Sequence, residues 1–156
     1  MSLWFNCTSA RNLEQNGLRK WAFPFDWNVT SFEGLCDVIN NDFVDFLNPQ
    51  YLDRRFCIYN TKYNLAFAHD FPVIQQSNGT YTEVSNYLDF LDEVVEKYQR
   101  RIERFYRVCE LADTVYFFRL KSLWERDNFP QNKSTITQLR DVLIKNFQLK
   151  TGYWWL

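Results

Sequence analysis

The stretch Leu65-Ala66-Phe67-Ala68-His69-Asp70-Phe71-Pro72 sets the interpretation of the whole chain. Its first half is a short apolar run of the kind that forms a buried strand. Pro72 has no backbone N–H and favours the end of that strand. His69 and Asp70 are therefore predicted to lie where the strand leaves the sheet, which in open α/β sheets is the edge where ligands bind. The chain has one histidine, so any chemistry that needs an imidazole is predicted here.

Helical and strand patterns alternate on both sides of this stretch. We expect helices over 10–18, 31–47, 82–111 and 135–149, and strands over 3–5, 56–59, 63–68, 114–119 and 153–156, with 56–59 and 63–68 joined as a hairpin. Ser31 is the expected start of the second helix and Gly17 the expected stop of the first.

The run Thr114-Val115-Tyr116-Phe117-Phe118-Arg119 is apolar on both faces, which is typical of a central strand in a parallel sheet. Helices that alternate with such strands form crossover connections. We therefore predict an α/β fold, a single three-layer domain over 1–156 with a mostly parallel central sheet flanked by helices. Because the chain stops within an apolar strand, we also expect a truncated C-terminus.

The composition disfavours several classes of partner. The chain has 156 residues, of which 46% are hydrophobic and 24% charged, and a net charge of -1. These values fit a soluble domain without general attraction to nucleic acid or to anionic membranes. No apolar run approaches the ~20 residues that cross a bilayer, and the N-terminal residues lack the pattern of a signal peptide. We expect neither a membrane nor a nucleic-acid partner.

The four cysteines, Cys7, Cys36, Cys57 and Cys109, show no CxxC pairing. This favours reduced thiols in a cytoplasmic protein, and the spacing predicts no metal site and no cofactor. Cys7 precedes the first predicted helix, where free N–H groups and the helix dipole stabilise a thiolate. A small buried side chain explains the same position equally well.

Basic residues follow acidic ones along the helix predicted over 82–111, an order that suits the helix dipole and a solvated face. The alternative is that Arg101 and Arg104 contact an anionic ligand. Arg119 ends the predicted central strand. The turn Asn6-Cys7-Thr8-Ser9 would offer backbone N–H groups to the same anion.

Six segments appear in the order and spacing of a known family. They are Ser2-Leu3-Trp4-Phe5-Asn6-Cys7, Leu18-Arg19-Lys20, Pro24-Phe25-Asp26-Trp27, Phe67-Ala68-His69-Asp70-Phe71 and Tyr98-Gln99-Arg100-Arg101-Ile102-Glu103-Arg104-Phe105, followed by Val115-Tyr116-Phe117-Phe118-Arg119. With them the chain resembles a family of uncharacterised proteins that carries the label "putative papain-like cysteine peptidase". The likeness covers roughly the first four-fifths of the chain.

The resemblance implies a catalytic pair of Cys7 and His69, with Asp70 or Asp26 as the acid that orients the imidazole. Backbone N–H groups at Cys7 and Thr8 would form an oxyanion hole. Papain itself has a helical domain followed by an antiparallel barrel. The alternation of helices and strands in this chain favours instead a Rossmann-like sheet.

Three functions follow from these observations. The first is a cysteine-dependent hydrolase that acts on an amide or acyl bond of a peptide or small molecule. The second is an α/β module that binds a small ligand or nucleotide, in which the turn Asn6-Cys7-Thr8-Ser9 and Arg119 hold an anion. The candidate substrate-binding residues are Asn6, Thr8, Arg101, Arg104 and Arg119. The third is a structural interaction domain. Polar residues after three predicted strands (Cys7, His69 and Arg119) favour a site over no site, and the family resemblance favours the hydrolase.

Overall fold

The computed structural model describes Met1, Leu3 and residues 8–118 and 133–147. Four short strands within residues 28–67 form an antiparallel sheet. The strands are β1 (Asn28–Thr30), β2 (Leu52–Arg54), β3 (Ile58–Asn60) and β4 (Leu65–Phe67), in the spatial order β1-β4-β3-β2. Strands β5 (Val73–Gln75) and β6 (Tyr81–Glu83) form a separate antiparallel hairpin.

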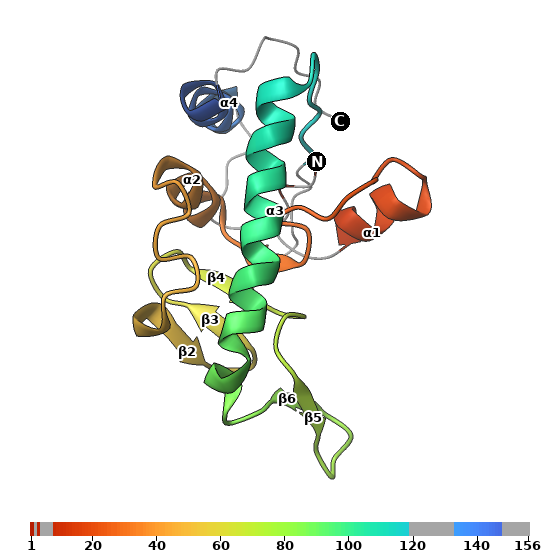
Figure 1. Cartoon of the computed structure of the whole chain (residues 1–156), viewed down its shortest axis with the longest axis vertical. Helices are drawn as coiled ribbons and strands as arrows, with labels where there is room; N and C mark the ends of the chain where they lie inside the picture. Colours follow the sequence, from red (N-terminus) through yellow and green to blue (C-terminus); the bar gives the residue numbers. More distant parts are fainter. Residues whose placement is uncertain (2, 4–7, 119–132, 148–156) are drawn as a thin grey trace.

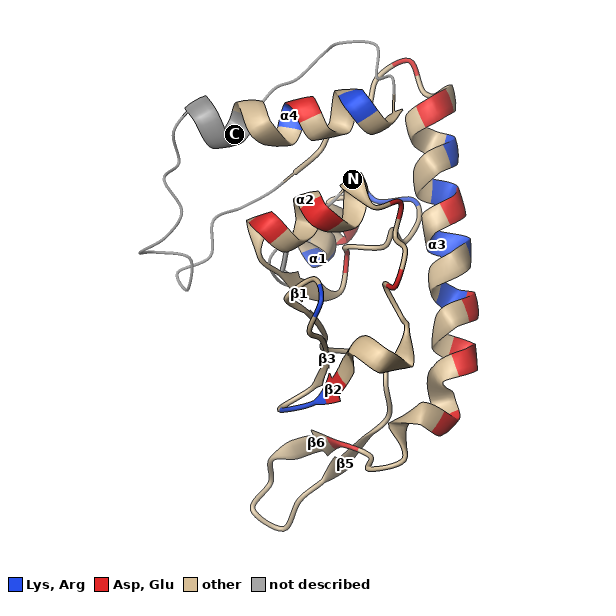
Figure 2. Ribbon diagram, turned by 90° about the vertical axis from the view of Figure 1, so that its left-hand side faces the viewer, with Lys and Arg blue, Asp and Glu red and all other residues tan. Residues whose placement is uncertain are grey.

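Four α-helices and two short 3₁₀ helices accompany these strands. They are α1 (Thr8–Gln15), α2 (Phe32–Asn40), η1 (Pro49–Tyr51), η2 (Tyr87–Phe90), α3 (Leu91–Leu111) and α4 (Lys133–Phe147). Helix α3 runs the length of the molecule, from the side of the β5–β6 hairpin to α4, and carries acidic residues in its first turn and basic residues farther along (Figures 1 and 2). None of the helices in the described part of the chain has the length and apolar composition needed to cross a membrane.

The core is built on aromatic rings around α3. The buried residues of α3 recur at helical spacing, which turns one apolar stripe toward the sheet and α2. Phe105 in this stripe is fully buried, and its ring packs against those of Phe23, Phe25, Phe43, Phe117 and Phe147. Most of these pairs are edge-to-face, and such pairs each add about 0.5–1.5 kcal/mol beyond the burial of their area.

The prediction of a mostly parallel, three-layer, Rossmann-like sheet is wrong, because both sheets are antiparallel. The segments 55–57 and 61–64 that connect β2, β3 and β4 are too short for a crossover, which needs about a dozen residues. The described part of the run 114–119 belongs to neither sheet. Instead, the N–H of Leu3 donates to the carbonyl of Phe118, and the N–H of Phe118 donates to the carbonyl of Met1, both at 2.9 Å.

The predictions of single turns and helix starts agree better with the structure than the prediction of the sheet type. The hairpin of 56–59 with 63–68 is confirmed as β3 and β4. Ser31 caps α2, its Oγ accepting from the N–H of Gly34 at 3.0 Å, but the helix ends at Asn40 because Asp42 and Phe43 have positive φ values of 49° and 58°.

The long helix predicted over 82–111 starts later than expected, at Leu91, because residues 81–90 supply β6 and η2. Helix α4 matches the helix predicted over 135–149. Gly17, with φ 67°, follows the end of α1. The strand predicted over 153–156 and most of the one over 3–5 lie outside the described residues.

Glu83 at the end of β6 is a carboxylate that the fold buries without a hydrogen-bond partner for Oε2. The nearby Arg54 donates from Nε and Nη2 to the backbone carbonyl of Glu83, at 3.1 and 2.8 Å. Burial therefore raises the pKa of this carboxyl above its usual value.

Replacing Glu83 with glutamine is expected to raise the melting temperature at neutral pH and to leave it unchanged in acid. A raised carboxyl pKa means that the folded state holds the proton more tightly than the unfolded state. The stability from this group is therefore fully present below its unfolded-state pKa and is lost as the pH rises through the folded-state pKa. Melting curves of both proteins from about pH 3 to about pH 8 test this. A difference that does not shrink toward acid would contradict it.

Candidate functional site

Two loops that are far apart in the sequence meet at one end of the β1–β4 ladder. The antiparallel register pairs Asn28 with Phe67, so the residues that precede β1 lie beside the residues that follow β4. Trp27 comes from the first loop and His69 from the second. Their ring centroids are 6.0 Å apart with planes at 88°, an edge-to-face contact.

Asp26 fixes the first of these loops. Its side chain is fully buried, and Oδ2 accepts from the backbone N–H of Phe23 at 2.8 Å and from Nη1 of Arg19 at 3.0 Å. Burial raises the pKa of this carboxyl, against the opposing effects of the Phe23 amide and the Arg19 guanidinium. Arg19 also pairs with Glu14 of α1 at 2.8 Å. The loop before β1 is thereby tied to α1.

Asp70 fixes the second loop to α3. Oδ1 lies 2.7 Å from Nζ of Lys97 and 3.6 Å from Nη1 of Arg101, and Oδ2 accepts from the hydroxyl of Tyr98 at 2.7 Å. The Asp70 side chain is 2% exposed. Two cations and one hydroxyl therefore satisfy a buried carboxylate, which is the arrangement that makes such burial tolerable.

The hydroxyl of Tyr98 joins the two loops. It lies 2.6 Å from Oδ1 of Asn28 as well as 2.7 Å from Asp70. The amide of Asn28 is itself oriented, because its Nδ2 donates to the carbonyl of Pro24 at 2.9 Å. Burial holds the pKa of Tyr98 well above its ordinary value, so the phenol stays neutral and donates its proton between two acceptors.

Of the predicted catalytic residues, the structure describes His69, Asp26 and Asp70. Neither the Asp26 carboxylate nor the Asp70 carboxylate is hydrogen-bonded to His69, because each binds the partners named above. Among the described residues the imidazole has an aromatic neighbour, Trp27, and no hydrogen-bond partner. Asn6, Cys7 and Arg119 lie outside the described residues, and of Thr8 only the backbone, at the start of α1, is described.

The two arginines predicted to contact an anionic ligand, Arg101 and Arg104, instead contact groups of the protein. The guanidinium of Arg101 lies over the ring of Tyr98 at 5.1 Å, and its Nη1 is buried beside Asp70 without a hydrogen bond. Arg104 donates from Nη1 to the carbonyl of Ala22 at 2.7 Å. Both side chains thus pack the loops around His69 against α3.

Two of the described cysteines are not activated as nucleophiles. Burial raises the pKa of the Cys57 and Cys109 thiols to about 12, so these cysteines stay protonated. Within the described ranges no group of three or more His, Cys, Asp or Glu side chains could hold a metal ion.

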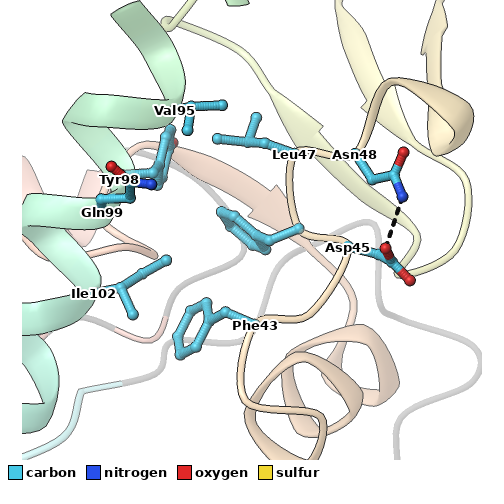
Figure 3. A pocket seen from close by; sticks show the side chains of 9 residues that line it. Phe43, Asp45, Leu47, Asn48, Val95, Tyr98, Gln99 and Ile102 are labelled. Carbon is cyan, nitrogen blue, oxygen red and sulfur yellow. Dashed lines mark hydrogen bonds between the residues drawn. The ribbon is translucent and has the colours of Figure 1, made fainter. Parts of the chain in front are cut away.

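A cavity of about 270 Å³, with Tyr98 in its wall, lies between α3 and the loop after α2 (Figure 3). Its wall is mostly apolar, and Nδ2 of Asn48 donates to Oδ1 of Asp45 at its rim, at 2.7 Å. No residue of the predicted site lines it. The lining residues are Phe43, Asp45, Phe46, Leu47, Asn48, Val95, Tyr98, Gln99 and Ile102.

Sequence reasoning missed the roles of Trp27, Arg19 and Tyr98. Their signal was present, because all three lie in the segments that carry the family resemblance. Without the pairing of β1 with β4, however, nothing in the sequence indicates that the segment around Trp27 contacts the one around His69.

Comparison with known proteins gives one family and one curated relative. A family model described as "Putative papain-like cysteine peptidase (DUF1796)" matches residues 1–150. The curated "Uncharacterized protein R408" of Acanthamoeba polyphaga mimivirus is 28% identical over 172 residues, which cover 92% of this chain and 69% of that protein. No solved structure matches the chain.

Proposed function

The chain belongs to the family described as "Putative papain-like cysteine peptidase", and from this premise we propose that it is a cysteine-dependent hydrolase with Cys7 as the nucleophile and His69 as the proton carrier. One observation carries the proposal within the described residues. The chain's one imidazole extends from the loop after β4, is exposed and packs against Trp27 of the loop before β1, and its ring nitrogens have no hydrogen-bond partner among the described residues. A general base needs such an unoccupied nitrogen.

The proposed reaction proceeds in two steps on an amide or acyl bond. The thiol of Cys7 gives its proton to His69, and the thiolate attacks the carbonyl carbon, while the imidazolium returns the proton to the departing amine or alcohol. Water then attacks the thioester, giving one proton to His69. The acid product departs as the proton returns to the sulfur of Cys7. The enzyme ends as it began.

The sequence position of Cys7 suits this role, because it directly precedes Thr8, the first residue of α1. The N–H groups at the start of a helix and its dipole stabilise a thiolate, and backbone N–H groups of Cys7 and Thr8 would receive the oxyanion. The small-ligand or nucleotide-binding alternative gains no support from Arg101 and Arg104, which are engaged with Asp70 and Ala22.

The pH dependence of Cys7 alkylation by iodoacetamide tests the proposal. We expect a midpoint well below the ~8.5 of a free thiol, and a return toward that value in His69→Ala, because the imidazolium that stabilises the thiolate is removed. Peptide-level mass spectrometry follows Cys7 separately. Cys57 and Cys109, with pKa values of about 12, serve as unreactive references in the same sample.

An unreactive Cys7, or a midpoint that His69→Ala leaves in place, would overturn the hydrolase. A lowered midpoint would justify a search for substrates among peptide amides and small acyl compounds, with Cys7→Ser as the inactive control.

A further inference from the structure

We propose that the indole of Trp27, and not a carboxylate, holds the imidazole of His69 in one orientation for proton transfer. Trp27 is thus a positioning residue, and this inference rests on the function proposed above. The contact that carries it is the edge-to-face packing of the two rings, with centroids 6.0 Å apart and planes at 88°.

The two acids that could orient an imidazole are engaged elsewhere. Both oxygens of Asp70 face groups of α3, at 2.7 Å from Lys97 and 2.7 Å from Tyr98. Oδ2 of Asp26 binds Arg19 and the Phe23 amide, and its Oδ1 is buried without any hydrogen bond. Neither carboxylate is hydrogen-bonded to His69. Asp26 is buried whereas His69 is exposed, and moving Asp70 toward the imidazole would break its buried interactions with α3, which is costly.

Trp27 is itself held firmly enough to position another side chain. Its two neighbours in the sequence, Asp26 and Asn28, are fully buried and bind back to their own loop, through the amide of Phe23 and the carbonyl of Pro24. The guanidinium of Arg19 lies 5.2 Å from the centre of the indole, and Asp26 and Glu14 hold that guanidinium in place. The indole of Trp27 therefore contacts a fixed guanidinium, that of Arg19, and the imidazole of His69.

Backbone and ring of His69 are therefore restrained by different partners. Asp70 anchors the backbone of the loop to α3, whereas Trp27 restrains the rotation of the imidazole. An aromatic contact restrains the ring without occupying either nitrogen. Both nitrogens then remain free to exchange protons, which a permanent hydrogen bond to a carboxylate would not allow at one of them.

The test compares Trp27→Leu with wild type, Trp27→Phe and His69→Ala. Trp21→Leu is the matched control, because Trp21 is an exposed tryptophan on the same segment of chain. The alkylation midpoint of Cys7 is the first readout. The second is the NMR signal of the imidazole, which is unambiguous because the chain has one histidine. An indole packed against the ring displaces this signal through its ring current.

In Trp27→Leu we expect a rise in the Cys7 midpoint toward that of His69→Ala, with a fall of about tenfold in the alkylation rate below the midpoint for each unit of rise. The imidazole signal should lose its ring-current displacement. In Trp27→Phe the Cys7 midpoint and the displaced imidazole signal should both stay close to their wild-type values, since a phenyl ring still supplies an aromatic contact. Trp21→Leu should change neither.

Each remaining outcome has a distinct meaning. A wild-type midpoint that is low and depends on His69, but is unchanged in Trp27→Leu, overturns the positioning role and leaves the hydrolase standing. A change in melting temperature without a change in midpoint does the same, because it shows a structural role alone. A wild-type midpoint equal to that of His69→Ala overturns the hydrolase and this inference with it.

Discussion

Gly34→Ala is expected to destabilise the fold strongly and to lower its melting temperature. A Cβ at this position would lie 1.9 Å from the carbonyl oxygen of Tyr63 and 3.1 Å from its carbonyl carbon. Those atoms are backbone and cannot rotate away as a side chain could. We expect a loss of about 3 kcal/mol or more in the free energy of unfolding, the upper end of what overpacking costs, even though alanine favours a helix over glycine by about 1 kcal/mol.

The turn that carries Tyr63 has little freedom to move. The N–H of Tyr63 donates to Oδ1 of the buried Asn60 at 2.9 Å, and Nδ2 of Asn60 donates to the carbonyls of Asp45 and Phe46. Asp37→Ala is the matched control, because Asp37 is exposed on the same helix. Melting curves of the two variants decide the matter. If Gly34→Ala melts as the control does, the close packing of α2 on this turn is wrong.

Asp70→Ala is expected to lower the free energy of unfolding by about 3 kcal/mol, because it leaves buried cationic groups without their counter-charge. For a chain of this length such a loss lowers the melting temperature by about 6 to 12 °C. The loss should lie at the lower end of the range for buried pairs. Lys97 is 30% exposed and can turn to water, whereas Arg101, at 14%, cannot do so easily.

Two further variants separate the charge from the hydrogen bond. Asp70→Asn keeps an oxygen for the Tyr98 hydroxyl but removes the charge, and should lose most of the same free energy. Tyr98→Phe keeps the pair of Asp70 with Lys97 and removes one hydroxyl, at an expected loss of about 1 kcal/mol. Asp92→Ala, on the exposed face of α3, is the control. Equal losses in Asp70→Asn and Asp92→Ala would show that the charge of Asp70 contributes nothing.

The sequence predicts local elements of this fold because their causes are local. A serine cap starts α2, a short turn joins β3 to β4, and the apolar spacing of α3 follows the helical period. The sheet type was predicted wrongly because it rested on the run 114–119. That run is as apolar as a central strand, yet its described part lies beside Met1 and Leu3 rather than in a sheet. Composition cannot distinguish these two ways of burying it.

The sequence predicted where His69 lies in the fold but not which side chains surround it. The position of His69 just after a strand is confirmed by β4. Asp26 lies in a loop before β1 that is held by buried hydrogen bonds. Which side chains meet depends on β1 pairing with β4 across more than thirty intervening residues. That is a long-range contact, and no local pattern encodes it. The roles of Cys7 and His69 remain predictions for the alkylation experiment.

The register of β1 against β4 has a consequence for which changes of chain length this family can accept. Side chains in a strand alternate between faces, so the gain or loss of one residue between Trp27 and Thr30, or between Leu65 and His69, would turn every following side chain to the opposite face. The connection from Ser31 to Asn64 lies outside the ladder. Natural insertions and deletions should therefore accumulate in its surface turns, while the two strand segments vary only by substitution.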